Sequence, residues 1–240
     1  MPDNLYIPSV DLRIGSLEEY NRRQKEHAAK LYKKPEFRPC ITVSREYGCT
    51  GYPAAEALRE TMAQRTGEEW VMVDTDVLEE VARRHNLSSE ILKTLGEDNR
   101  VLAQVLATFS NRWKSNHDYF LPLARHIVAL AEQGNVIIVE MGGAVITRHI
   151  EHSFHFRIYG SAHFKSAKLA RRLHVETEEA ETLMLRQQKV RNNFSRDFLN
   201  ADSNDPALYH MLFNNDRCTH AKIAETIADF VRPEGTRATK

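Results

Sequence analysis

From residue 40 onward, short apolar stretches alternate with helix-like patterns, and this alternation constrains the fold more than any other feature. The helix-like patterns cover residues 54–65, 76–85, 88–113, 118–133, 161–173, 177–198 and 219–231. Apolar runs that alternate with helices are typical of parallel strands buried on both faces. We therefore expect an α/β sandwich of three layers, with a five-stranded parallel sheet and helices on both faces. The predicted strands are Cys40–Ser44, Trp70–Asp74, Val136–Glu140, Phe154–Tyr159 and Tyr209–Asn214.

The predicted sheet lies in one domain over residues 40–232, with an extension over 1–39 before it and a flexible polar tail over 233–240 after it. In the extension, residues 1–14 look irregular, and Ser16 is a suitable cap for a charged helix. The apolar residues of this helix make only a thin stripe. We expect a solvated helix lying on the domain surface, and the alternative is a contact between copies of the chain.

Charge and cysteine usage exclude several classes of protein. Lys and Arg total 33 and Asp and Glu total 33, so the formal charge is zero. This balance argues against a general nucleic-acid or membrane-surface protein, and no apolar run is long enough to suggest a membrane span. The three cysteines, Cys40, Cys49 and Cys218, are odd in number and widely spaced, which does not suit a disulfide framework. The N-terminus lacks the pattern of a secretory signal, so we expect a cytoplasmic protein.

Residues 41–53 have the order of a phosphate-binding loop. The short strand is followed by glycines at Gly48 and Gly51, and a helical pattern begins at Ala54. Glycines let backbone N–H groups approach phosphate oxygens, and a helix N-terminus adds partial positive charge. We therefore expect this loop to bind an anion. The residues expected to contact a nucleotide there are Arg45, Tyr47, Gly48, Cys49, Thr50, Gly51 and Tyr52.

The loop nevertheless lacks two groups of the full pattern G-x-x-x-x-G-K-[ST]. When the pattern is aligned on Gly51, its lysine falls on Tyr52 and its hydroxyl residue falls on Pro53. The cation for the β- and γ-phosphates and the hydroxyl for Mg²⁺ are thus both missing. Arg45 is a candidate replacement for the cation, and the alternative is a local pair between Arg45 and Glu46.

Acidic residues stand at the ends of two other predicted strands, where ligands of parallel sheets bind. Glu140 ends the run VIIVE, which has the form of a Walker-B strand whose carboxylate holds Mg²⁺. Asp74 ends the second strand, where a carboxylate can accept a substrate hydroxyl or hold a basic side chain. Asp76 is explained by capping the helix that follows.

The predicted helix 177–198 carries most of the candidate cations. Lys189 and Arg196 share its polar face, whereas Arg191 falls among apolar residues. An arginine that points inward is costly unless an anion meets it. We expect Arg191 to contact a phosphate. The alternatives are a side chain that reaches out to solvent and an internal ion pair with an acid such as Asp74.

Over roughly residues 40–231, the chain resembles the cytidylate kinase-like family of P-loop nucleoside monophosphate kinases. The resemblance implies a P-loop fold and transfer of the γ-phosphoryl of ATP to a nucleoside monophosphate, with Mg²⁺. Two cations of the family pattern are absent: Tyr52 stands at the basic loop position, and the Gly-Arg after the third strand is replaced by Glu140 and Met141. The motifs, in the family's order, are SREYG at 44–48, VDTD at 73–76, VIIVEMGG at 136–143, RQQKVR at 186–191 and NDP at 204–206.

The same resemblance implies roles for particular residues. Lys189 and Arg191 match the lid cations that reach the transferring phosphate, Glu140 would hold Mg²⁺, and Asp74 borders the acceptor pocket together with Gly142 and Gly143. Since charge stabilisation dominates phosphoryl transfer, a chain without the loop lysine, the loop hydroxyl and the acceptor arginine should be slow. The sequence therefore predicts a nucleotide-binding protein that is a cytidylate-type kinase if active. The alternatives are an impaired kinase fold that binds nucleotides, anions or proteins, and a kinase for another acceptor.

Overall fold

The computed structural model of the chain describes residues 7–30, 38–84, 92, 117–140 and 142–231. Its centre is one five-stranded sheet in the order β2-β3-β1-β4-β5, with every neighbouring pair parallel. This arrangement confirms the expected parallel sheet. The strands are β1 (Cys40–Arg45), β2 (Val71–Val73), β3 (Val136–Val139), β4 (Ser153–Tyr159) and β5 (Met211–Asn214).

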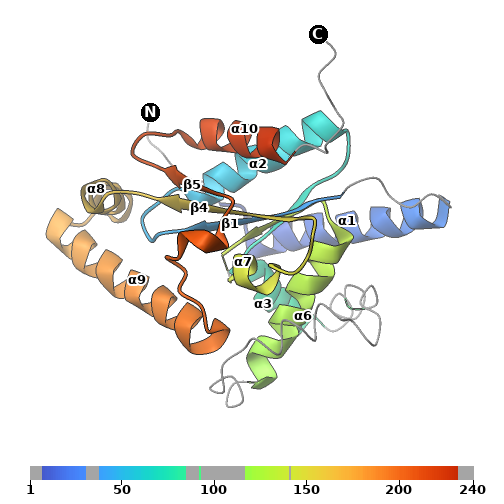
Figure 1. The fold of residues 1–240 in the computed structure, drawn as a ribbon, viewed down its shortest axis with the longest axis horizontal. Helices are drawn as coiled ribbons and strands as arrows, with labels where there is room; N and C mark the ends of the chain where they lie inside the picture. Colours follow the sequence, from blue (N-terminus) through green and yellow to red (C-terminus); the bar gives the residue numbers. More distant parts are fainter. Residues whose placement is uncertain (1–6, 31–37, 85–91, 93–116, 141, 232–240) are drawn as a thin grey trace, which may run out of the picture.

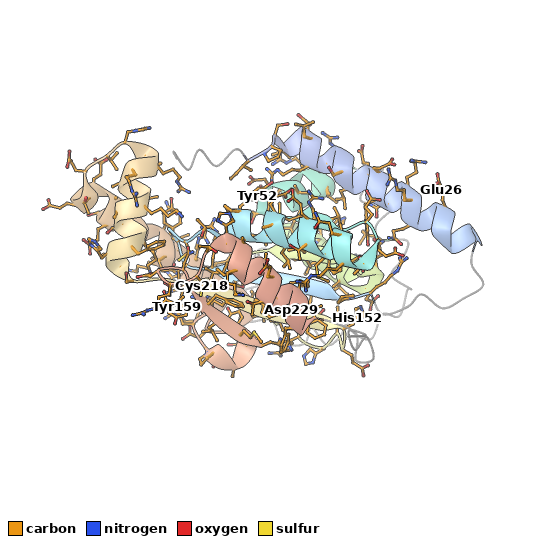
Figure 2. The ribbon with its side chains drawn as sticks, turned by 90° about the horizontal axis from the view of Figure 1, so that it is seen from above. Glu26, Tyr52, His152, Tyr159, Cys218 and Asp229 are labelled. Atoms are coloured by element: carbon orange, nitrogen blue, oxygen red, sulfur yellow. The ribbon has the colours of Figure 1, made fainter. Side chains whose placement is uncertain are left out.

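Helices cover both faces of this sheet, as expected, and give three layers (Figure 1). One face carries α2 (Gly51–Thr66) and α10 (His220–Phe230), which lie side by side in both views (Figure 1 and Figure 2). The other face carries α3 (Thr75–Arg83), α6 (His117–Gln133) and the short α7 (Gly143–Ile146). The helix expected at 88–113 lies outside the described residues, apart from residue 92.

A helical hairpin extends beyond the carboxyl ends of the strands (Figure 1). It consists of α8 (Ala162–Leu173) and α9 (Thr177–Leu199), which pack along each other around a small apolar core of their own. A single 3-10 turn, η2 (Pro206–Leu208), then leads from α9 into β5. The hairpin therefore projects from the domain. Where it contacts the domain, it brings side chains of α9 to the carboxyl ends of the strands.

The alternation of side chains along β4 shows how the strands divide the interior. Phe156 and Ile158 are buried in the cluster that α2 and α10 cover. His155 and Arg157, between and beside them, point to the opposite face because successive side chains of a strand alternate. Both are nonetheless buried, at 6% and 4% exposed. The sheet therefore has polar groups inside it on the α7 side.

The N-terminal helix α1 (Val10–Lys30) packs against β2 and α3. Ile14, Leu17 and Tyr20 are fully buried and belong to the core cluster that includes α3 and α6. The Tyr20 hydroxyl donates a hydrogen bond to the Gly134 carbonyl oxygen. The thin apolar stripe of this helix is thus part of the main core.

The start of α1 differs from the sequence prediction. The helix begins at Val10, and Ser16 lies inside it, where its hydroxyl donates to the Leu12 carbonyl oxygen. The Ser9 hydroxyl accepts from the Leu12 amide instead, at 3.4 Å. Burial of Ile14 favours this longer helix, because the first turns contribute to the core.

None of the helices among the described residues is long and apolar enough to cross a bilayer. The three cysteines are free thiols, with Cys40 and Cys49 buried and Cys218 partly exposed.

We expect Leu17→Ala to lower the free energy of unfolding by about 2–5 kcal/mol, the usual cost of emptying a buried leucine site. Leu12→Ala is the matched control in the same helix, since Leu12 is 60% exposed, and it should change stability by less than about 0.5 kcal/mol. Urea unfolding followed by circular dichroism measures both. Equal, small effects would mean that α1 is not docked on the core.

Candidate functional site

The glycine loop joins β1 to α2 at the carboxyl edge of the sheet. Gly48 has a φ of +97°, which favours glycine, and it lies directly against Lys165 of α8. Gly51 opens α2 and lies under the Arg45 side chain, where a Cβ would be 2.2 Å from Arg45 Cδ. Because neither glycine has a Cβ, Lys165 and Arg45 can pack directly on the loop backbone.

Three loop amides that were expected to hold phosphate already donate to protein acceptors. The bonds are Tyr47 N to Gln188 Oε1 at 2.8 Å, Cys49 N to the Glu46 carbonyl oxygen at 3.1 Å, and Thr50 N to Asn215 Oδ1 at 2.9 Å. The first turn of α2 still presents the amides of Gly51 and Tyr52, which have no acceptor within the helix. Anion binding by this loop thus depends on few backbone donors.

The Cys49 side chain is buried beneath the loop. Burial raises the pKa of its thiol to about 12, and the nearby Glu46 carboxylate acts in the same direction. Cys49 therefore stays protonated near neutral pH and is not a nucleophile.

Glu140 is held between two arginines that come from different elements. Its Oε1 lies 3.1 Å from Arg45 Nε at the end of β1, and its Oε2 accepts from Arg191 Nη1 of α9 at 2.7 Å. Arg191 also lies 5.3 Å from the Tyr47 ring centre. Arg45 is thus paired with Glu140 rather than Glu46, and the acid that meets Arg191 is Glu140 rather than Asp74.

The backbone of Glu140 is strained. Its φ is +73°, a left-handed conformation that costs a non-glycine residue about 1–3 kcal/mol unless the surroundings fix it. The Glu140 amide donates to the Val43 carbonyl oxygen at 3.1 Å, and the Glu140 carbonyl oxygen accepts from Gly143 at 3.0 Å. These bonds hold the turn from β3 into α7 and direct the carboxylate toward the arginines.

The surroundings of Glu140 do not fit a resident Mg²⁺. Both carboxylate oxygens face guanidinium groups, so the local charge is positive and the usual oxygen ligands of Mg²⁺ are engaged. Within the described ranges, no group of three or more His, Cys, Asp or Glu side chains is arranged to hold a metal ion. Glu140 is therefore placed here as an ion-pair partner of Arg45 and Arg191.

A second acid, Glu46, is paired with a cation of the hairpin. Its Oε2 accepts from Lys165 Nζ at 2.5 Å and from the Gly160 amide at 3.3 Å. Arg157 Nη2 is more distant, at 3.8 Å from Glu46 Oε1. The Lys165 ammonium thus accounts for the charge of Glu46, and within the described ranges no carboxylate lies closer to Arg157 than Glu46 Oε1.

A cavity of about 50 Å³ lies between the carboxyl ends of β1, β3 and β4 and the second half of α9. Its charged lining consists of Arg45, Arg157, Arg191 and Glu140, and Gly142 also borders it. Burial lowers the pKa of the Arg45 guanidinium; Glu140 opposes this shift, and Arg191 lowers the pKa further. Since three arginines and one glutamate line the cavity, its positive charge exceeds its negative charge.

Of the residues predicted from sequence, the structure brings together Arg45, Glu140, Gly142 and Arg191 at this cavity. Lys189 is exposed and does not line it. A larger open hollow of about 400 Å³ lies along the first half of α9, and none of the predicted site residues borders it.

Gly143 is buried in the first turn of α7, where an added Cβ would be 3.2 Å from Ile138 Cγ2 and 3.3 Å from Thr42 Cγ2. Its close packing on β1 and β3 is a structural reason for glycine at this position.

Asp74 does not border the cavity, and its partners are residues of α1 and α3. Its carboxylate accepts from the Val77 amide at 3.1 Å and so caps α3, which corrects the assignment of this cap to Asp76. It also accepts from Arg13 of α1, whose guanidinium is 6.0 Å from the Tyr52 ring centre. Figure 2 shows Tyr52 at the start of α2, on the side that faces α1. Asp74 and Tyr52 thus meet the N-terminal helix.

Sequence reasoning missed three side chains that build the site. Arg157 had a usable signal, because FHFRIY places an arginine on one face of a strand whose other face is apolar. Gln188 and Asn215, which bond the loop amides, have no comparable local signal. Their roles arise from segments that lie 141 and 165 residues away from the loop residues they contact.

The cytidylate kinase-like family matches residues 40–217, close to three quarters of the chain. The chain belongs to this family. The match leaves out α1, although α1 is part of the core and contacts Asp74. No curated protein sequence matches the chain at a significant level.

Among solved structures, an uncharacterized protein from Eubacterium ventriosum is 15% identical with a TM-score of 0.62, over 81% of this chain and 98% of the other. This similarity shows a shared fold. Two more distant structures are shikimate kinase from Bacteroides thetaiotaomicron, 12% identical with a TM-score of 0.40 over 80% and 98% of the two chains, and dephospho-CoA kinase from Campylobacter jejuni, 9% identical with a TM-score of 0.37 over 82% and 98%.

We expect Gly51→Ala to lower the free energy of unfolding by about 1–3 kcal/mol, because the new Cβ overlaps the Arg45 side chain that Glu140 holds. Gly15→Ala is the control: Gly15 is an exposed position inside α1 with open space around it, so alanine should raise stability by about 0.5–1 kcal/mol. Chemical denaturation distinguishes the two directions. An unchanged Gly51→Ala variant would show that Arg45 is not fixed over the loop.

Proposed function

We propose that this member of the cytidylate kinase-like family binds a nucleotide, with the phosphate groups at the carboxyl ends of β1, β3 and β4. The observation that carries the proposal is an excess of two positive charges at this edge. The charged groups there are Arg45, Arg157, Lys165 and Arg191 on one side and Glu46 and Glu140 on the other. Ligands of open parallel sheets bind at this edge, so the charge and the fold support the same place.

In this proposal ATP is the nucleotide, and the chain is a slow kinase for a nucleoside monophosphate. The loop over residues 45–52 faces the phosphates, and Arg191 offsets the charge that develops on the transferring group. Asp74, Gly142 and Gly143 are on the acceptor side. Because two arginines engage Glu140, we assign any Mg²⁺ to the phosphates of the nucleotide rather than to this carboxylate.

A second candidate is a binding module without useful turnover. Three observations favour it: Tyr52 and Pro53 stand where the loop lysine and hydroxyl belong, three loop amides are already bonded, and the cavity is too small for a nucleoside. Losing one charge-stabilising group costs about 10²–10³ in rate, and this chain lacks more than one. Measured turnover separates the two candidates.

The proposal extends to the cellular location of the protein and to the ligands and chains that it contacts. We place the protein in the cytoplasm, in keeping with three free thiols, and we expect a small phosphate-containing ligand rather than a nucleic acid or a membrane. The apolar stripe of α1 is used within its own chain. A contact between copies through this helix would therefore have to use its exposed, charged face.

We expect ATP to raise the melting temperature in a concentration-dependent way, since a ligand that binds only the folded state stabilises it. Turnover with CMP, UMP or dCMP should be at least ~10² below the usual kinase range of 1–100 s⁻¹. Thermal shift with and without Mg²⁺, together with a coupled assay for ADP release, measures both. Ordinary kinase rates would contradict slow chemistry, and no shift with any nucleotide would contradict binding.

Arg191→Ala should weaken ATP binding by about 1–3 kcal/mol, the scale of a hydrogen bond to a charged group. Arg196→Ala is the matched control, because Arg196 lies on the same helix but is exposed and does not border the cavity. Isothermal titration calorimetry gives both affinities. Equal losses in the two variants would indicate a general charge effect rather than a contact made by Arg191.

A further inference from the structure

We propose that the cavity beside β4 is a subsite for a doubly charged oxyanion, the phosphoryl group of a phosphorylated ligand, and that Arg157 is its principal cation. The inference rests on the proposed function and deepens it. In this arrangement a set of arginine side chains binds the phosphate, in place of the backbone amides of the glycine loop.

Arg157 is a buried cation with incomplete partners. Its side chain is 5% exposed, yet its nearest carboxylate oxygen among the described residues, on Glu46, is 3.8 Å away and belongs to a group that Lys165 already neutralises. A guanidinium has five N–H donors, and burying its charge is costly unless an anion meets it. Arg157 makes one short bond, from Nη2 to Asn204 Oδ1 at 2.8 Å, and one long bond, from Nη1 to the Tyr209 hydroxyl at 3.4 Å. Its guanidinium also lies 5.7 Å from the centre of the Tyr209 ring, which is a contact for the charge but takes up none of the N–H donors in the plane of the guanidinium. Donor capacity is therefore left for a ligand.

The charge of the cavity selects the kind of anion. Three arginines and one glutamate line it, so its net charge is +2. A phosphoryl group at neutral pH carries about two negative charges and balances this excess, whereas a single carboxylate leaves one positive charge buried. Arginine forks also match the geometry of phosphate oxygens.

The size of the cavity limits how much of the ligand enters it. Its volume is about 50 Å³, where one water needs about 10–15 Å³ on the same measure. A small polyatomic group fits, and a nucleoside does not. The rest of the ligand must therefore lie outside the cavity, so the subsite recognises the phosphoryl end of the molecule.

The geometry also assigns this subsite to side chains rather than to the backbone amides of the loop. The amides of Tyr47 and Thr50 are bonded to side chains of other segments, while Arg157 reaches across to residues 203–209. The Tyr209 hydroxyl donates to the Ser203 carbonyl oxygen at 2.8 Å and fastens this segment beside the cavity. An anion bound at Arg157 should thus order residues 203–209 more than the start of α2.

The first test uses inorganic phosphate as the probe. Thermal unfolding is followed in sodium phosphate and in sodium chloride at equal ionic strength and pH 7.5, for the wild type, Arg157→Met and Arg196→Met. We expect phosphate to raise the melting temperature of the wild type and of Arg196→Met alike. Arg157→Met should need at least tenfold more phosphate for the same shift. Equal phosphate responses in all three proteins overturn the subsite.

A second test needs no variant and covers the case in which Arg157→Met does not fold. Hydrogen exchange of the wild type is measured with and without phosphate. Slower exchange at residues 203–209 is the expected result. Slower exchange confined to residues 50–54 would place the anion on the loop and overturn the proposal, as would no change anywhere.

The outcomes also separate this inference from the proposed function. A wild type that is stabilised by ATP but not by phosphate beyond the chloride control overturns the subsite and leaves nucleotide binding intact. A wild type that responds to phosphate through Arg157 but to no nucleotide supports the subsite and contradicts a nucleotide as the ligand.

Discussion

The carboxylate of Glu140 is the contact on which the arrangement of the site depends, because it joins three elements at one point. It follows β3, pairs with Arg45 at the end of β1, and pairs with Arg191 on α9. The three side chains are 20–30% exposed, so their ion pairs are neither fully desolvated nor fully screened by solvent. The left-handed backbone at Glu140 shows that the fold accepts local strain to direct this carboxylate inward.

This contact also attaches the α8–α9 hairpin to the domain. The hairpin has a small core of its own, and it meets the loop through Gln188 and Lys165 as well as Arg191. These three contacts are polar, and apolar residues at the end of α9, among them Phe198 and Leu199, pack on the main core. Of the three polar contacts, the one made by Arg191 uses a group that a phosphate in the cavity would also engage. An anion in the cavity would therefore change the attachment of the hairpin, since it would compete with Glu140 for the same arginines.

The positive charge near the loop comes from a different position than in the full phosphate-binding pattern. Without a lysine at position 52, the positive charge near the loop comes from Arg45, whose side chain crosses Gly51. Tyr52 instead faces Arg13 of α1. This helix lies outside the part of the chain that the family match covers. The N-terminal helix is thus joined both to the apolar core and, through Asp74, to the edge of the site.

The sequence by itself determined the architecture, because runs such as VIIV and the helical periods between them leave few ways to bury both faces of a strand. It also predicted Arg45, Glu140 and Arg191 as site residues, since each breaks an apolar pattern or ends a strand, and the structure places all three at one cavity. Tertiary structure alone decided that Glu140 holds two arginines, that Asn215 and Gln188 take the loop amides, and that Arg157 opens onto the same cavity. Periodicity records which face a residue occupies, whereas the partner of a buried charge depends on which distant segments the packed core brings within hydrogen-bond reach.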